Sequence, residues 1–253
     1  MKKTPLITIF FLLSSLSYGQ SNVDGLENLR DSLNRELAKS TTSKKTIDLA
    51  LEIAGLYLST NPDSIIKYAE LALEVSIKED NLRGQIGALG FLGEAQIYKG
   101  NLPKTLELGL QAIELSKNLP IEDAFIGPTY YNMAELYAQI GEYEKSLIYG
   151  QKLIILGPKE KGGNVTGAYG YFERANAFVR MNMPDSALKN LELSYKIFET
   201  VKEELFGNSY SVYPAWYNLR AKVYFQQDKP AEGLQDLFTG LELTKKSNEP
   251  YHI

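Results

Sequence analysis

Apolar residues recur along this chain at helical spacing, and short polar turns separate the helical stretches. In the first stretch Leu26, Leu29, Leu33 and Leu37 fall on one stripe, which predicts an amphipathic helix. No run of alternating β-branched residues predicts a strand, so the pattern indicates an all-α chain. The later turns are rich in Gly, Pro, Asn and Asp, as tight helix–helix corners require. They lie at 61–64, 100–103, 141–144, 182–186 and 227–230.

The helical pattern returns five times at a spacing near forty residues. Each copy has a small residue in its first helix, a bulky or polar residue three positions later, and small residues in its second helix. Antiparallel helices approach closely where small side chains face each other, so the pattern predicts five helix pairs. The first-helix small residues are Ala54, Gly93, Ala134, Ala175 and Ala221.

The periodicity also sets the expected domain limits. We expect a leading helix that caps the N-terminal end within residues 20–44, and a helical repeat array over 45–253. Longer linkers are expected between the pairs, one of them over 204–213. The repeats are expected at about 45–79, 84–120, 125–158, 166–203 and 212–247.

The motif resembles the tetratricopeptide repeat (TPR), whose pattern combines a large residue, Leu, a small residue and Tyr. The resemblance covers about residues 45–247, and Arg174 and Arg220 stand where the family usually has Leu. The period of about 41 residues exceeds the usual 34 of that family. The resemblance implies a right-handed α-α superhelix (a TPR solenoid) of about five pairs. In the third copy the matching residues are Tyr130, Met133, Ala134, Tyr137, Ser146 and Leu147.

In TPR proteins the first helices line a concave face that binds peptides or partner helices. The resemblance therefore implies a protein or peptide partner and a face made of equivalent first-helix positions. Aromatic side chains there provide large contact areas, although each of them, Trp216 included, can instead pack between helices. The family's Lys–Asn–Arg set that clamps a C-terminal carboxylate is absent. The expected face comprises Glu94, Ile97, Tyr131, Glu135, Tyr169, Phe172, Asn176, Asn218, Lys222 and Phe225.

The N-terminus has the pattern of a secretory signal peptide. Lys2 and Lys3 precede an apolar run at 6–13, and small residues follow up to Gly19. We expect residues 1–19 to be removed by cleavage between Gly19 and Gln20, the alternative being an N-terminal membrane anchor. The absence of cysteine suits an oxidising bacterial periplasm, where we expect the protein to reside.

Composition leaves few options for chemistry. The chain has no cysteine, its one histidine is His252, and its net charge is −4. We therefore expect no enzyme activity, no cofactor, no metal site and no nucleic-acid partner. The glycine-rich segment 161–170 lacks the spacing of a phosphate-binding loop and is expected to be a linker. Carboxylates lie in turns and on helix faces expected to be exposed, so we expect none with a strongly raised pKa.

The last helix carries an apolar stripe that no later segment of the sequence covers. Leu234, Leu237, Phe238 and Leu241 are expected to meet a second copy or a further C-terminal segment. The long period is similar to that of TPR ectodomains in bacterial sensor histidine kinases and regulators. We therefore expect the interaction part of a periplasmic signalling protein; the alternative is a self-standing periplasmic adaptor that assembles envelope complexes.

Overall fold

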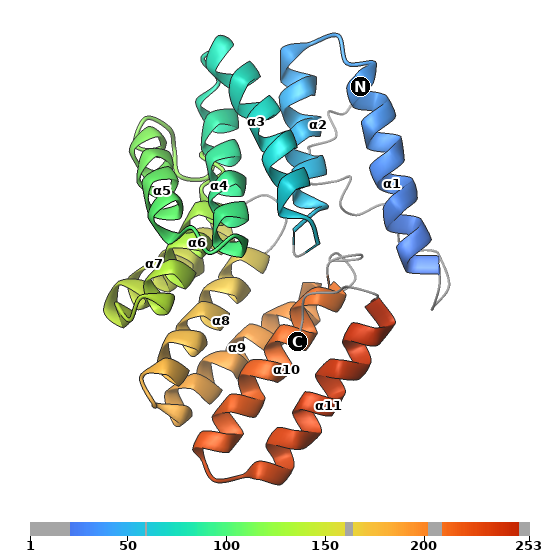
Figure 1. The fold of residues 1–253 in the computed structure, drawn as a ribbon. Helices are drawn as coiled ribbons and strands as arrows, with labels where there is room; N and C mark the ends of the chain where they lie inside the picture. Colours follow the sequence, from blue (N-terminus) through green and yellow to red (C-terminus); the bar gives the residue numbers. More distant parts are fainter. Residues whose placement is uncertain (1–20, 59, 160–163, 202–208, 248–253) are drawn as a thin grey trace. The chain divides into compact units, whose positions relative to one another are not determined.

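A computed structural model describes residues 21–58, 60–159, 164–201 and 209–247 of the 253-residue chain. The expected signal peptide lies outside the described residues. Within them the chain is all-α, which confirms the prediction of a leading helix followed by five helix pairs (Figure 1). The α-helices are α1 (Ser21–Ala38), α2 (Ser43–Gly55), α3 (Pro62–Lys78), α4 (Leu82–Tyr98), α5 (Leu102–Ser116), α6 (Gly127–Gln139), α7 (Tyr143–Leu156), α8 (Val165–Arg180), α9 (Pro184–Val201), α10 (Ser209–Gln226) and α11 (Pro230–Ser247).

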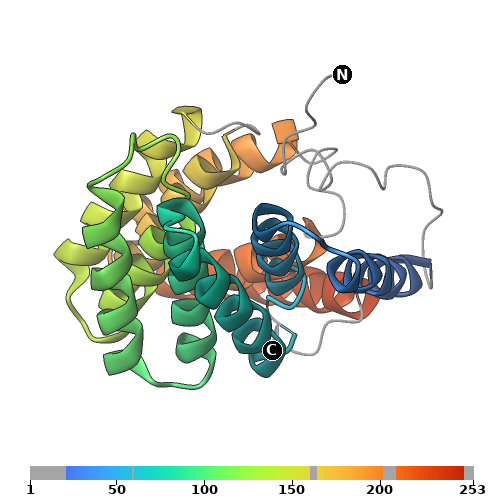
Figure 2. The same cartoon turned by 90° about the horizontal axis from the view of Figure 1, so that it is seen from above.

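The helices group into two compact units, Asp24–Leu136 and Tyr137–Ile253. In the first unit each helix from α2 to α5 packs against the next one, and α2 also contacts α4. In the second unit α7 packs against α8, α8 against α9, and α10 against both α9 and α11 (Figure 2). The first helices α4, α8 and α10 are therefore each packed between two neighbouring helices, as the repeat pattern predicts.

Asparagine and threonine side chains cap the N-terminal ends of helices α2 to α5. Thr42 caps α2 by accepting a hydrogen bond from the backbone N–H of Lys45 at 3.3 Å. Asn61, Asn81 and Asn101 cap α3, α4 and α5 in the same way. Each cap satisfies one of the backbone N–H groups that a helix start leaves without a partner. These polar residues in the predicted turns thus determine where the helices begin.

Four of the corners that join the two helices of a pair are closed by the same backbone arrangement. One residue takes a positive φ, and the next N–H donates to the carbonyl five residues back, which satisfies a helix end. That carbonyl belongs to the position three after the first-helix small residue, so the corner keeps register with the repeat. The positive-φ residues are Gly100, Gly141, Asn182 and Asp228, and the accepting carbonyls belong to Gln96, Tyr137, Phe178 and Tyr224.

Helix α4 carries a stripe of glycines at every third position, and all of them are buried. A Cβ at Gly87 would run into the ring of Phe125, and one at Gly93 would lie 3.1 Å from Asn132 Nδ2. The missing side chains therefore allow the segment before α6, and α6 itself, to lie directly on the backbone of α4. The stripe comprises Gly84, Gly87, Gly90 and Gly93.

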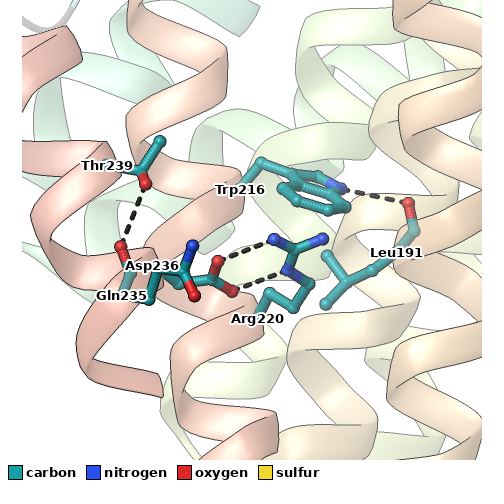
Figure 3. Close-up of polar contacts among 6 residues, drawn as sticks. All are labelled: Leu191, Trp216, Arg220, Gln235, Asp236 and Thr239. Atoms are coloured by element: carbon teal, nitrogen blue, oxygen red, sulfur yellow. Dashed lines mark hydrogen bonds and ion pairs between the residues drawn. The ribbon is translucent and has the colours of Figure 1, made fainter. Parts of the chain in front are cut away.

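Trp216 lies in the core of the second unit and is only 3% exposed. Its indole Nε1 donates to the carbonyl oxygen of Leu191 at 3.0 Å, which joins α10 to α9 (Figure 3). Its ring packs with Ala175, Ala187 and Leu219 among others. Of the two roles that the sequence left open for Trp216, the structure therefore supports packing between helices.

Arg220 shows why an arginine can replace the usual leucine of the repeat. Its Nε and Nη2 each donate to a carboxylate oxygen of Asp236 on α11 at 2.6 Å (Figure 3). The guanidinium also lies over the ring of Trp216, 4.5 Å from its centroid. Asp236 is 4% exposed, so the bidentate pair is screened little by solvent and ties α10 to α11.

The prediction of a linker reaching Tyr213 is wrong, because α10 begins at Ser209 and includes Pro214. Proline lacks the N–H that would bond to the carbonyl four residues earlier, which is why it was expected to precede the helix. Pro214 is the sixth residue of α10, so it disrupts only the first turn and a half. Packing of Val212 and Tyr213 against Ala168 and Phe198 stabilises that start.

Asp236→Ala should destabilise the second unit by about 3 kcal/mol, because it leaves the partly buried Arg220 without its partner. Unfolding in urea followed by tryptophan fluorescence checks this, since Trp216 is the one tryptophan of the chain and reports on this unit. Glu242→Ala, which removes an exposed pair with Lys245, is the matched control and should cost less than about 1 kcal/mol. Equal losses in the two variants would contradict the role given to Asp236.

Candidate functional site

In the first unit the expected binding face places two acidic residues on neighbouring first helices. Glu94 and Ile97 lie on α4, and each is 9% exposed. Tyr131 and Glu135 lie on α6 and are half-buried. Of these residues, Glu94 and Glu135 lie near enough for their charges to interact, and the aliphatic Ile97 is the least suited to meet a polar ligand.

Glu94 is held in an unusual state by its surroundings. The pKa of Glu94 is raised to about 8, first by burial and then by the nearby Glu135 carboxylate, against the lowering effect of the hydrogen bond from Tyr98. The Tyr98 hydroxyl donates to Glu94 Oε1 at 3.1 Å. The expectation that no carboxyl would have a strongly raised pKa is therefore wrong at this position.

The seam between α4 and α6 also contains an unsatisfied polar atom. Asn132 on α6 is 2% exposed, and its Nδ2 donates to the carbonyl oxygen of Gly90 on α4 at 2.8 Å. Its Oδ1 has no hydrogen-bond partner. Because Oδ1 and Nδ2 share one carbon, this acceptor also lies in the seam, beside the helical turn that leads to Glu94.

Glu52 on α2 is a second buried carboxyl group that the sequence analysis missed. It is 9% exposed, and its pKa is raised to about 7 by burial first and then by Glu36 and Asp48. Burial also raises the pKa of Asp48, against the charges of Arg83 and Lys44. The signal was present in the sequence, because Glu52 is flanked by apolar residues on both sides.

In the second unit the expected face is more aromatic and partly exposed. Tyr169 packs edge-on against Phe198 with centroids 5.3 Å apart, and Phe172 packs against the core around Trp216. Lys222 on α10 is exposed, and Phe225 one turn later is 43% exposed. The remaining expected residues, Asn176 on α8 and Asn218 on α10, are half-buried.

The apolar stripe of α11 is exposed. Leu234 and Phe238 are 50% and 65% exposed, and Leu237 and Leu241 are 37% and 39% exposed. Beside the stripe lies an open hollow of about 570 Å³, lined by Ala231, Leu234, Gln235, Phe238, Thr239 and Glu242. Leucines and a phenylalanine this exposed on one helix are an unusual surface for a folded chain.

The described residues also bear on metal binding and membrane insertion. Within them no group of three or more His, Cys, Asp or Glu side chains is arranged to hold a metal ion. Among the same helices none is both long enough and apolar enough to span a membrane.

Solved structures with a similar fold are TPR-like. A crystal structure of TPR-like repeats assigned to a kinesin light chain of Podosopora anserina has a TM-score of 0.51 and 16% identity, covering 83% of this chain and 100% of that chain. A single-substitution variant of the same fungal repeats has the same TM-score and 18% identity, covering 79% of this chain and 95% of that chain. No family model and no curated protein matches the sequence.

The chain is therefore a TPR-like repeat protein in its fold. Because the sequence identity is low, the likeness extends to the fold and not to the partner of the fungal protein.

Glu94→Gln should alter how stability depends on pH. The folded state keeps a proton on Glu94 up to about pH 8, whereas the unfolded chain releases it near 4.5. The contribution of Glu94 to the free energy of unfolding should therefore fall by about 1.4 kcal/mol per pH unit through that window.

Thermal unfolding followed by circular dichroism checks this prediction. Near pH 4.5 the parent and the Gln variant should unfold at similar temperatures, and above pH 8 the variant should be the more stable. The exposed Glu107→Gln on α5 is the control and should follow the parent at every pH. A constant offset between parent and Glu94→Gln would contradict the raised pKa.

Proposed function

We propose that the chain is a scaffold that binds a protein or peptide partner through the exposed side chains of its first helices. The observation that carries this proposal is the contrast along α10. Trp216, Leu219 and Val223 are buried in the core of their unit, whereas Lys222 and Phe225 are exposed on the same helix. A cation and a large aromatic side chain left exposed on an otherwise packed helix suit a partner surface.

Lys222→Glu combined with Phe225→Ala should weaken partner binding by at least about ten-fold, which corresponds to about 1.4 kcal/mol. The partner is first captured from an extract with the immobilised parent chain, and its affinity is then measured against each variant. Lys189→Glu on the second helix α9, also exposed, is the matched control and should bind like the parent. An unchanged affinity of the double variant would move the site away from α10.

We propose further that the stripe of α11 mediates self-association in an antiparallel arrangement. Around a two-fold axis near Leu237 and Phe238, Leu234 of one copy would meet Leu241 of the other. The acidic first turn at Glu232 would then approach the basic last turn at Lys245. A two-fold contact of this kind requires a self-complementary patch, and this stripe has one.

Leu241→Glu should convert dimers into monomers, because it introduces a carboxylate into an apolar contact that two copies share. Light scattering over a range of concentrations measures the change. Glu192→Gln, which removes an exposed carboxylate on α9, should leave the association intact. A parent chain that stays monomeric at every concentration would refute the arrangement.

We propose that the protein is exported to the periplasm and that residues 1–19 are removed. The support is the basic, apolar and small-residue order of the N-terminal sequence. N-terminal sequencing of the protein recovered from the envelope fraction should begin at Gln20, and an intact Met1 there would contradict cleavage. The interaction part of a signalling protein is the preferred role, and an envelope adaptor is the alternative. An output domain encoded in the same reading frame distinguishes the first from the second.

A further inference from the structure

The corner that joins α2 to α3 is completed by a side chain from α1. The guanidinium of Arg30 on α1 donates from Nη2 to the carbonyl oxygen of Leu56, the residue that follows α2. The same group donates to Oγ1 of Thr60 at 3.3 Å. Carbonyl groups at the C-terminal end of a helix carry partial negative charge and favour a cation. Arg30 therefore acts as a ligand of this helix end.

An aromatic ring completes the surroundings of Arg30. Its guanidinium carbon lies 4.4 Å from the centre of the Tyr57 ring, and that ring stacks on the ring of Tyr68 with centroids 6.0 Å apart. The Thr60 hydroxyl donates to the carbonyl of Tyr57 at 3.0 Å, which leaves its lone pairs for Arg30. A carbonyl oxygen, a hydroxyl oxygen and a ring face suit a flat guanidinium. The Leu56 carbonyl, Tyr57 and Thr60 thus form a guanidinium-binding site, the corner site.

The helix that supplies Arg30 is attached through few buried side chains. Among residues 27–38 of α1 only Leu33 is buried, whereas every residue from Leu49 to Leu56 in and after α2 is buried. Segments with little buried surface open locally at a lower free energy than the core of the same domain. The burial pattern therefore favours detachment of α1 over unfolding of the first unit.

Further contacts from α1 are polar. The Tyr68 hydroxyl donates to Asn34 Oδ1 at 2.6 Å, and Lys45 pairs with Glu36 at 3.2 Å, where both side chains are about half exposed. Nε of Arg30 is buried and has no hydrogen-bond partner among the described residues. A buried donor left unpaired costs free energy, and an exposed ion pair contributes little. The corner site is therefore filled by α1 at a modest net gain.

We propose that the corner site binds an arginine on an amphipathic helix of a partner protein, and that α1 occupies it as an internal competitor until that helix displaces it. The expected partner helix presents a leucine beside its arginine and another leucine one turn later, as α1 does with Leu29, Arg30 and Leu33. Lysine should bind less tightly, because an ammonium group lacks the planar fork of a guanidinium. The inference rests on the proposed partner-binding function and adds a second binding site to it.

Binding of a labelled α1 peptide to the full chain tests the proposal. The probe is a fluorescein-labelled peptide with the sequence of residues 21–40, measured by fluorescence anisotropy. The parent chain should bind it weakly, because its own α1 competes at a local concentration on the order of millimolar. Arg30→Ala in the chain should tighten binding at least about ten-fold, because the apparent dissociation constant falls as the fraction of open sites rises.

Two peptide variants separate the arginine from the helix that carries it. Measured on the Arg30→Ala chain, the peptide with Arg30→Ala should bind about ten-fold more weakly than the parent peptide, through the lost contacts with Leu56 and Thr60. The peptide with Arg35→Ala loses an exposed arginine of the same helix and should change by less than about two-fold. Because these changes are in the peptide, the comparison does not depend on the stability of a chain variant.

Amide hydrogen exchange of the parent chain gives a readout that needs no peptide. The amides of α1 should exchange faster than those of residues 49–56, because local opening releases α1 alone. Equal protection of the two segments would refute detachment.

Three binding results would also overturn the assignment. Equal losses for the two peptide variants would show that the arginine is not recognised. Unchanged peptide binding by the Arg30→Ala chain would make α1 a permanent cap. A captured partner that binds the parent and the Arg30→Ala chain equally would refute displacement of α1 by a partner.

Failure here stays distinguishable from failure of the proposed function. Lys222→Glu with Phe225→Ala should leave binding of the α1 peptide unchanged, because the corner site does not include α10. If the captured partner depends on Lys222 and Phe225 while the peptide is indifferent to Arg30, only the corner site is wrong. If the peptide depends on Arg30 while the captured partner is indifferent to Lys222 and Phe225, the corner site stands and the proposed face on α10 is wrong.

Discussion

Close approach of helix backbones is the constraint on which the rest of this structure depends. Where a first helix meets its neighbours the side chains are small. In the glycine stripe of α4 they are absent altogether, so neighbouring groups contact the helix backbone. At Gly90 the amide of Asn132 reaches the backbone carbonyl itself. A larger side chain at these positions would push the helices apart, and the polar contacts between them would be lost. Packing density therefore decides which polar groups can meet.

The polar groups that this packing buries are compensated in two different ways, which are two different solutions to their burial. Arg220 and Asp236 form a complete bidentate pair, and the guanidinium also gains contact with Trp216. Glu94 has a tyrosine hydroxyl and a second carboxylate as neighbours, so it keeps its proton to an unusually high pH. The first solution joins helices within the second unit. The second lets a carboxyl group keep its proton inside the first unit.

The architecture was readable from the sequence because it depends on features that recur. Ala54, Ala134, Ala175 and Ala221 are all buried at first-helix positions, and the turn residues Gly100, Gly141, Asn182 and Asp228 lie at the corners. The start of α10 was not readable, since tertiary packing of Val212 and Tyr213 outweighs the local signal of Pro214. Burial of Glu94 was missed because the charge of a side chain says nothing about how tightly its helix is enclosed, whereas the apolar neighbours of Glu52 did indicate that it would be buried. The role of Trp216 required the contacts across helices, which periodicity alone does not provide.

The four corners described above are closed by backbone groups alone, at a residue that needs only to tolerate a positive φ. The outward-facing side chains take no part in these backbone hydrogen bonds. A gene segment running from one corner to the next therefore encodes a self-contained module with matching ends. Duplication or loss of such a segment would lengthen or shorten the array without disturbing its joints. Proteins built in this way can change the surfaces they present in evolution while their framework is preserved.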